Sequence, residues 1–465
     1  MSQKPRQLVL NAFFQRFGHH VAAWRHPSST DNGRPSLDWY VNAIKLAEAA
    51  KFDGFFLADF IGRSGAVTPD TGRNALNYQF EPLTLLSALA TATRHIGLVA
   101  TINTNFDTPY QVARKLTSLD HISGGRAAWN VVSSFGEHTA ANFGIKEPRE
   151  HAERYARATE FVELAKRLWD SYDDDTFDNP NRRTGQFYEP KSAHPLRVEG
   201  KYFSSEGLLD FPRPIQGHPV IVTAGNSDTG RDFAARFGEV TYASATSLDV
   251  AKAYYADVKS RLAKFGRAED QLKITPGLSV VVAESDQEAQ DLFGEVQALV
   301  DFNNLSFGGF DLSGYPLDGP LPDLPYQEGE NGRGRFRQQL ELARRENLTI
   351  RELVLRFRVA RGHVQAIGSV KTVADLIEQW FVERGADGFN VVPPYLPRGF
   401  EDFTRLVVPE LQRRGIFRKE YEGRTYRENL GLDRPADLAH RAANEPFPQA
   451  AQGKPLAEDL QLASS

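Results

Sequence analysis

Hydrophobic residues form two alternating patterns along this chain. Short apolar runs are typical of strands buried on both faces, and the longer stretches between them, with apolar residues three or four apart, are typical of helices. We predict strands at 8–13, 54–58, 96–101, 127–132, 220–223, 240–243, 278–282 and 388–392. We predict helical segments at 37–47, 82–93, 109–121, 151–170, 229–237, 249–264, 286–301, 336–360, 372–384 and 400–413.

Eight strands that alternate with helices favour an α/β protein with a (β/α)₈ TIM barrel over an open, doubly wound sheet. A doubly wound sheet usually shows a Gly-rich turn after its first strand. Here the first strand runs into Phe13-Phe-Gln-Arg-Phe17, and no G-x-G-x-x-G or G-x-x-x-x-G-K-[ST] motif occurs. The barrel is therefore our predicted fold.

The chain has 465 residues, whereas a typical barrel needs about 250. We expect one domain over 1–465, with insertions near 60–80, 171–215 and 303–360. A polar C-terminal extension, 415–465, is expected to lie over the surface. The Gly- and Pro-rich part at 303–334 also carries aromatic residues, so a mobile lid and an excursion packed on a partner subunit both explain it.

Composition removes several classes of function. The chain has 55 Lys and Arg against 60 Asp and Glu, a net charge of −5, and no basic stripe; this argues against nucleic acid. No apolar run could span a membrane and no leader directs secretion, so we expect a cytoplasmic protein. The absence of Cys excludes disulfides and thiolate metal sites, and no metal site is expected.

Polar residues follow successive predicted strands, and in a barrel these strand ends meet at the face that carries the active site. Ser227 lies at a helix start, where unpaired N–H groups and the helix dipole favour a phosphate. His151 and Tyr155 are four residues apart, hence on one helix face, and Tyr155 can donate its hydroxyl to the same phosphate. For each residue alone, a helix cap, turn or structural hydrogen bond explains the pattern equally well. The candidates are Asp59, Thr101, Asn130, Ser134, His151, Tyr155 and Ser227.

Several motifs together resemble the bacterial-luciferase-like flavin monooxygenases, within them the nitrilotriacetate monooxygenase component A and dibenzothiophene-sulfone monooxygenase group. The resemblance spans roughly 8–412 in the family's order. The matching stretches are Asn11-Ala-Phe, Trp24-Arg-His-Pro27, Phe52-Asp-Gly-Phe-Phe-Leu-Ala-Asp59, Glu81-Pro-Leu-Thr-Leu-Leu-Ser87, Ile96-Gly-Leu-Val-Ala-Thr101, Leu119-Asp-His-Ile-Ser-Gly-Gly-Arg-Ala-Ala-Trp-Asn-Val-Val-Ser133, His151-Ala-Glu-Arg-Tyr155, Ala224-Gly-Asn-Ser227 and Gly388-Phe-Asn-Val391.

The resemblance implies a monooxygenase that uses reduced FMN supplied by a separate NAD(P)H:flavin reductase. In that family oxygen adds to the flavin C4a position, and the resulting peroxide oxygenates a small organic substrate. Carried over by position, the flavin contacts fall on Asp59, Thr101, His151, Tyr155 and Ser227, with Asn130 and Ser134 beside the flavin ring. A homodimer or homotetramer is implied as well.

Other functions fit the same residues. A deazaflavin-dependent oxidoreductase would share the barrel and the phosphate site, and a non-catalytic flavin-binding protein would bind FMN without turnover. A barrel hydrolase would need a metal cluster or paired carboxylates, for which the sequence shows no convincing spacing. No catalytic acid or base is assigned, and the sequence does not choose between a sulfur compound, an amine and another xenobiotic.

Overall fold

The computed structural model describes most of the chain. The described residues are 6–29, 34–59, 61–62, 79–133, 137–145, 149–302, 306–307, 310–324, 340–358 and 362–436.

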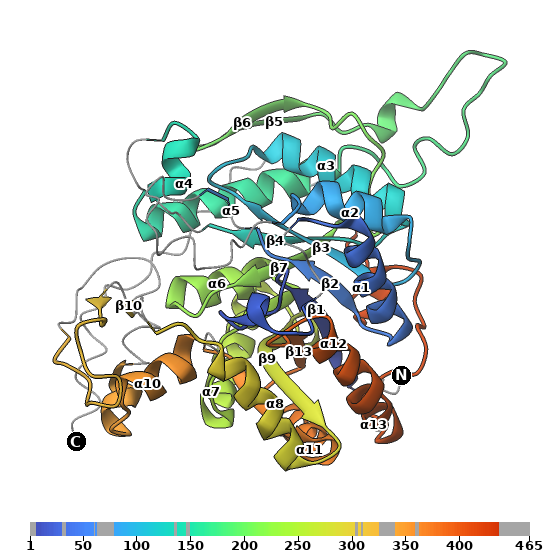
Figure 1. Ribbon diagram of the computed structural model, residues 1–465. Coiled ribbons are helices and arrows are strands. Elements are labelled where there is room, and N and C mark those ends of the chain that lie inside the picture. Colours follow the sequence, from blue (N-terminus) through green and yellow to red (C-terminus); the bar gives the residue numbers. More distant parts are fainter. Residues whose placement is uncertain are drawn as a thin grey trace.

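Eight parallel strands form a closed barrel (Figure 1). Each strand pairs with the next in chain order, and the last pairs with the first, where Val9 lies opposite Gly388. The predicted (β/α)₈ barrel is confirmed. The barrel strands are β1 (Val9–Phe14), β2 (Gly54–Leu57), β3 (Gly97–Asn103), β4 (Ala127–Val132), β7 (Val220–Ala224), β8 (Val240–Ala243), β9 (Lys273–Ala283) and β13 (Gly388–Val391).

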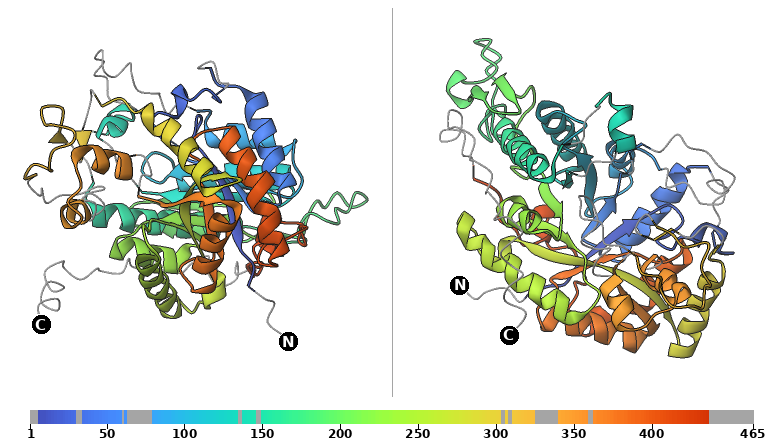
Figure 2. Two further views of the ribbon diagram at one scale, coloured as in Figure 1. Left: turned by 60° about the horizontal axis from the view of Figure 1, so that its bottom comes forward. Right: turned by 90° about the vertical axis from the view of Figure 1, so that its left-hand side faces the viewer.

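Helices surround the strands (Figure 2). Serine side chains cap several of them: Ser36 accepts a hydrogen bond from the backbone N–H of Trp39, and Ser285 accepts one from that of Glu288. The helices are α1 (Leu37–Ala49), α2 (Pro82–Ala90), α3 (Pro109–Ser123), α4 (Glu137–Asn142), α5 (His151–Trp169), α6 (Asp228–Phe237), α7 (Leu248–Leu262), α8 (Asp286–Ala298), α10 (Ile350–Leu353), α11 (Val370–Val382), α12 (Arg398–Asp402), α13 (Val408–Arg413) and α14 (Tyr426–Asn429).

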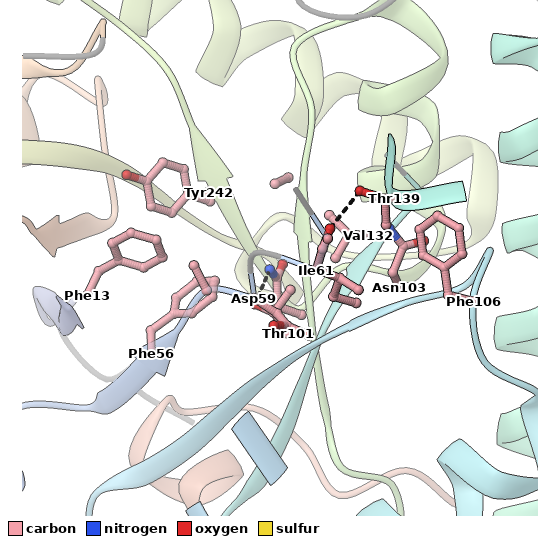
Figure 3. A pocket seen from close by; sticks show the side chains of 14 residues that line it. Phe13, Phe56, Asp59, Ile61, Thr101, Asn103, Phe106, Val132, Thr139 and Tyr242 are labelled. Atoms are coloured by element: carbon pink, nitrogen blue, oxygen red, sulfur yellow. Dashed lines mark hydrogen bonds between the residues drawn. The ribbon is translucent and has the colours of Figure 1, made fainter. Parts of the chain in front are cut away.

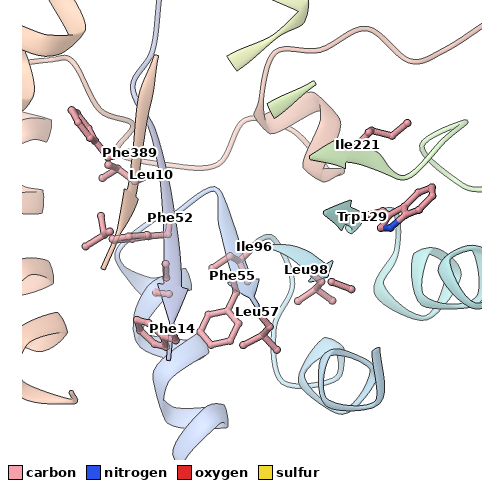
Figure 4. Packing of buried hydrophobic residues seen from close by; sticks show 14 of the residues in the cluster. Leu10, Phe14, Phe52, Phe55, Leu57, Ile96, Leu98, Trp129, Ile221 and Phe389 are labelled. Atoms are coloured by element: carbon pink, nitrogen blue, oxygen red, sulfur yellow. The ribbon is translucent and has the colours of Figure 1, made fainter. Parts of the chain in front are cut away.

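The main hydrophobic core lies between the barrel and these helices. Alternate strand residues face outward, and Figure 4 shows part of this layer, with Phe14, Phe55, Leu98 and Trp129 among its fully or almost fully buried members. The residues between them face the barrel interior, where Phe56, Val99 and others form a second cluster.

One strand was missed by the sequence reading. The strand β12 (Val364–Ser369) pairs in parallel with the second half of β9, from Val364 opposite Leu278 to Ser369 opposite Ala283. The strand β9 has 11 residues and agrees with our expectation that 278–282 lies within a longer extended stretch starting near Leu272. Its first half closes the barrel and its second half continues beyond to pair with β12.

The expectation that the polar extension lies over the surface holds only in part for its described residues, 415–436, because several of them are buried. Tyr426 is fully buried and packs with Leu430 and Leu432 against inward-facing strand residues, including Val9 and Val99. These residues lie at the start of their strands, so the extension closes the end of the barrel opposite the strand C-termini. Residues 437–465 lie outside the described part.

The predicted insertion at 171–215 is in part packed against α5. It contains the antiparallel hairpin of β5 (Leu196–Glu199) and β6 (Ser204–Gly207). The Glu160 carboxylate on α5 accepts hydrogen bonds from the backbone N–H groups of Tyr202 and Phe203, at 2.9 and 2.6 Å. Another part projects from the body of the molecule (Figure 1).

The interval 303–360 is described only in part. A short hairpin joins β10 (Ser306–Phe307) to β11 (Phe310–Asp311), and Leu312 and Leu324 are buried against residues of α8. Residues 340–345 and α10, with the π-helical Val354–Arg358, bear out the predicted helical material there. Residues 303–305, 308–309 and 325–339 lie outside the described part, so the lid and the partner contact both stay predictions.

Candidate functional site

A cavity of about 540 Å³ lies at the C-terminal ends of the barrel strands (Figure 3). It is built by side chains from six strands and the segments that follow them, which is where barrel enzymes place their active sites. The lining residues are Phe13, Phe56, Ala58, Asp59, Ile61, Gly62, Thr101, Asn103, Phe106, Asn130, Val132, Thr139, Ala224 and Tyr242.

Two neighbouring strands supply a hydrogen-bonding group to the cavity. Thr101 on β3 lies directly opposite Asn130 on β4, and the Asn130 Nδ2 donates to Thr101 Oγ1 at 2.9 Å. The Asn130 Oδ1 is buried and has no hydrogen-bond partner among the described residues. A buried amide oxygen of this kind is costly unless something donates to it, so it is suited to a ligand N–H.

The other side of the cavity is aromatic. Phe13 on β1 lies opposite Phe56 on β2, and their ring centroids are 4.9 Å apart in an edge-to-face arrangement. The Tyr242 ring on β8 lies 5.3 Å from that of Phe13. In Figure 3 these three rings lie together on one side, with Asn103, Phe106 and Thr139 across the cavity.

A polar cradle lies where β7 turns into α6, next to the cavity residue Ala224. Ser227 is the N-cap of α6, and its Oγ accepts a hydrogen bond from the Gly230 N–H at 3.1 Å. The Tyr155 hydroxyl is hydrogen-bonded to Ser227 and to Ser133. A Cβ on either Gly225 or Gly230 would lie only 3.0 Å from that hydroxyl, so glycine at both positions keeps the space open.

Two features fix the groups around this cradle. The Tyr254 hydroxyl on α7 donates to the Gly225 carbonyl at 3.1 Å and so holds the turn. The His151 and Tyr155 rings on α5 are 4.9 Å apart, which confirms that both lie on one helix face.

Burial raises the pKa of Tyr155, although its hydrogen bonds to Ser227 and Ser133 partly oppose this shift. The phenol therefore stays protonated at neutral pH and can donate a hydrogen bond to an anion.

The chain matches the family model described as luciferase-like monooxygenase over residues 16–388. It belongs to the luciferase-like monooxygenase family. The chain is 45% identical over 444 residues to nitrilotriacetate monooxygenase component A of Aminobacter aminovorans, with 92% of this chain and 97% of the relative covered. It is 43% identical over 443 residues to N-acetyl-S-(2-succino)cysteine monooxygenase of Bacillus subtilis (strain 168), with 94% and 99% covered.

A solved structure of a riboflavin lyase, described as containing modified FMN and the substrate riboflavin, has a TM-score of 0.80. It is 30% identical to this chain, and the alignment covers 94% of this chain and 99% of that one. Since several relatives that align over most of the chain are monooxygenases, this luciferase-like protein is an enzyme of the monooxygenase class.

In this luciferase-like monooxygenase the structure brings the predicted site residues into two groups. Asp59, Thr101 and Asn130 line the cavity. His151, Tyr155 and Ser227 lie at the cradle beside it. Ser134 lies outside the described residues, although its neighbour Ser133 contacts Tyr155. Their role in binding a flavin stays a prediction.

The sequence reading missed the aromatic side of the cavity. Phe13, Phe56 and Tyr242 belong to apolar strand segments, and such residues are usually core. A usable signal was strand alternation: Phe13 and Phe56 have the inward parity of Asn11 and Gly54, whereas Phe14 and Phe55 face the helices.

No helix of the described chain has the length and apolar character to cross a membrane.

Proposed function

We propose that the chain is the oxygenating component of a two-component system, an FMNH₂-dependent monooxygenase that acts on a small organic substrate. The observation that carries this proposal is the pairing of an anion cradle with the cavity. Tyr155, Ser227 and the start of α6 offer hydrogen-bond donors for a phosphate, and Asn130 and Thr101 offer hydrogen bonds to a heterocycle within the same barrel mouth.

The residues fit FMN at both ends of that ligand. A helix of ten residues points its N-terminal N–H groups and its dipole at a bound phosphate. Gly225 and Gly230 leave space beside the Tyr155 hydroxyl that any side chain would fill. The unpartnered Asn130 Oδ1 suits an N–H of the flavin pyrimidine ring, and a cavity of about 540 Å³ is within the usual range for cofactor sites.

When bound, reduced FMN would supply the two electrons that let one atom of O₂ enter the substrate while the other leaves as water. The protein's part is positioning. Tyr155 and Ser227 would anchor the phosphate, Thr101 would hold the Asn130 amide in place, and Asp59 would lie beside the ring. Ile61, Phe106 and Val132 give the cavity apolar walls that exclude water.

We further propose that a separate NAD(P)H:flavin reductase supplies the reduced FMN, in the cytoplasm, and that the chain works as a homodimer or homotetramer. The name of one relative, nitrilotriacetate monooxygenase component A, supports a partner component. The substrates named for the two relatives above are a tertiary amine and a thioether. A small molecule with an oxidisable nitrogen or sulfur atom is therefore the substrate class to test first.

The test is oxygen consumption by the purified protein with reduced FMN generated by an added flavin reductase. Amine, thioether and aryl sulfone substrates are compared, and each oxygenated product is identified by mass spectrometry. We expect one product atom to carry ¹⁸O from ¹⁸O₂. Turnover without O₂ and preferred binding of a deazaflavin would instead identify a deazaflavin-dependent oxidoreductase, and FMN binding without any turnover would indicate a non-catalytic flavin carrier.

A further inference from the structure

The aromatic side of the cavity has a defined internal order. Phe13, Phe56 and Tyr242 come from three separate strands and make edge-to-face or tilted contacts, with centroid distances of 4.9, 5.3 and 6.1 Å. Phe13 and Tyr242 are half-buried even though they lie inside the barrel, so part of each ring faces the cavity. Apolar surface of this kind is stabilised when a ligand covers it. These three residues are called the aromatic corner below.

The Tyr242 side chain is fixed at its hydroxyl end, on the side away from Asp59 and Thr101. Its hydroxyl is hydrogen-bonded to His363 Nε2 at 3.1 Å, and the two rings meet edge to face at 5.5 Å. In Figure 3 the hydroxyl points away from Asp59 and Thr101. A Cβ on Gly277 of β9 would lie 2.5 Å from His363 Nδ1 and 2.6 Å from the Tyr242 hydroxyl. The backbone of β9 therefore lies directly against the His363 and Tyr242 side chains, and neither ring has room to move toward it.

The same pair is connected to the anion cradle. Asn226, next to Ser227, donates from its Nδ2 to the Ser244 carbonyl at 3.1 Å. Ser244, two residues after Tyr242, donates from its Oγ to the Gly362 carbonyl at 2.9 Å. Gly362 immediately precedes His363. Asn226, Ser244 and Gly362 thus link the turn before α6 to the segment that carries His363.

We infer that the aromatic corner binds the uncharged, apolar part of the organic substrate, such as a thioether or aryl group, and that His363 is a positioning residue that fixes the Tyr242 ring for this contact. This inference rests on the proposed function. It assigns the polar side of the cavity to the cofactor, because Thr101 and Asn130 offer hydrogen bonds there. The corner presents aromatic surface, and such surface attracts thioether sulfur and other rings.

The test measures binding, so it does not depend on turnover. Protein loaded with oxidised FMN is titrated with thioanisole, an uncharged aryl thioether, and with its charged analogue 4-(methylthio)benzoate, and binding is followed by the visible difference spectrum of the flavin. FMN affinity is measured separately by fluorescence quenching. We expect thioanisole to bind more tightly than the charged analogue.

The variants are Tyr242→Phe, which keeps the ring but loses the hydroxyl, His363→Leu, and the two combined. We expect each single change to weaken thioanisole binding by about three- to tenfold, as for a lost hydrogen bond, with FMN affinity changed less than twofold. The double variant should be no weaker than the singles, because both remove one interaction. His363→Gln, which can still bond the phenol, should recover much of the affinity. The control is His194→Leu, which removes a hydrogen bond between His194 and Asp173 within the interval 171–215. This change should affect neither affinity.

The outcomes separate the two proposals. If the wild-type protein does not bind FMN, the proposed function is wrong. If it binds FMN but shows no response to thioanisole, or prefers the carboxylate, the corner is not an apolar substrate site. Should Tyr242→Phe weaken FMN binding as much as thioanisole binding, the corner holds the flavin instead. Additive losses in the double variant would remove His363 from its positioning role.

Discussion

The ring of Tyr426 lies against Gly97 at the closed end of the barrel, where a Cβ on Gly97 would come within 2.3 Å of Tyr426 Cδ2. Gly54 on the neighbouring strand would likewise bring a Cβ to 2.9 Å from the Tyr426 hydroxyl. Glycine at these two positions thus leaves the space inside the barrel that the Tyr426 side chain of the C-terminal extension occupies. Tyr426, Leu430 and Leu432 of the extension therefore belong to the barrel core.

This contact predicts that Gly97→Ala destabilises the protein. Adding a methyl group to a filled core typically costs about 1–3 kcal/mol, and the fully buried Tyr426 ring has little room to retreat. Denaturant unfolding followed by circular dichroism measures the loss. Combining Gly97→Ala with Tyr426→Ala should recover part of the steric cost, which tests the contact itself.

A matched control is Gly294→Ala. Gly294 lies in the middle of α8, is exposed, and has no atom near the position of an added Cβ. That change should stabilise the helix by about 0.5–1 kcal/mol. If Gly97→Ala behaves like Gly294→Ala, Tyr426 does not occupy the barrel end as described.

The sequence was sufficient for the barrel because its signals are local. A run such as 54–58 is uniformly apolar, and serine caps such as Ser36 mark helix starts. The strand β12 was missed because Val364–Ser369 has no continuous apolar run: Val364, Ala366 and Gly368 are buried and alternate with the half-buried Gln365, Ile367 and Ser369. It also pairs only with the far half of β9. Such a strand is defined by a partner about 85 residues away, which no local pattern shows.

The site was predictable where polarity itself was the signal. Asp59, Thr101 and Asn130 stood out as polar residues at the ends of apolar strands, and the structure places all three around the cavity. Tyr242 and Tyr426 did not stand out, since a buried tyrosine in a strand or in a polar tail is common. Their importance comes from contacts with Gly277 and Gly97 that exist only in the folded barrel.

A second prediction concerns how the free energy of unfolding depends on pH through Asp53, whose buried carboxyl lies just before β2. Burial raises the pKa of Asp53 to about 6 from 3.8, although the Arg418 guanidinium, with its Nη2 2.5 Å from Asp53 Oδ1, opposes the shift. Because the folded pKa is above the unfolded one, the folded state binds the proton more tightly. The stability that this proton contributes is fully present below pH 3.8 and is lost as the pH rises through about 6.

The measurement is the free energy of unfolding of wild type and Asp53→Asn between pH 5 and pH 7.5. As the pH falls across this range, wild type should gain stability relative to the variant, by an amount on the order of 1 kcal/mol. The comparison cancels the titration of other groups that both proteins share. Parallel pH curves for the two proteins would show that Asp53 does not titrate in this window.

The third prediction is the oligomeric state. The tail gives no reason to expect an assembly, because its described part is already used inside the barrel, so the expectation rests on the family resemblance alone. We expect sedimentation equilibrium at working concentration to give at least twice the chain mass of 51.9 kDa. A single species at the chain mass would refute a dimer or tetramer.

The last prediction is that Ser227 and Tyr155 bind the FMN phosphate. Each hydroxyl lost from a bond to a charged group should cost about 1.5–3 kcal/mol, so Ser227→Ala and Tyr155→Phe should each weaken reduced-FMN binding by roughly ten- to a hundredfold. Anaerobic titration measures this affinity, and riboflavin, which lacks the phosphate, is the matched ligand whose binding both variants should leave nearly unchanged.

Ser227 also caps α6, so a loss of helix order could mimic a lost phosphate contact. Ser285→Ala removes the equivalent cap from α8, away from the cradle, and should lower the free energy of unfolding by about 1 kcal/mol without changing FMN affinity. If Ser227→Ala and Tyr155→Phe reduce riboflavin and FMN affinity equally, the two residues shape the cavity and the phosphate lies elsewhere. If FMN affinity falls and riboflavin affinity does not, the start of α6 is the phosphate site, because only the phosphate distinguishes the two ligands.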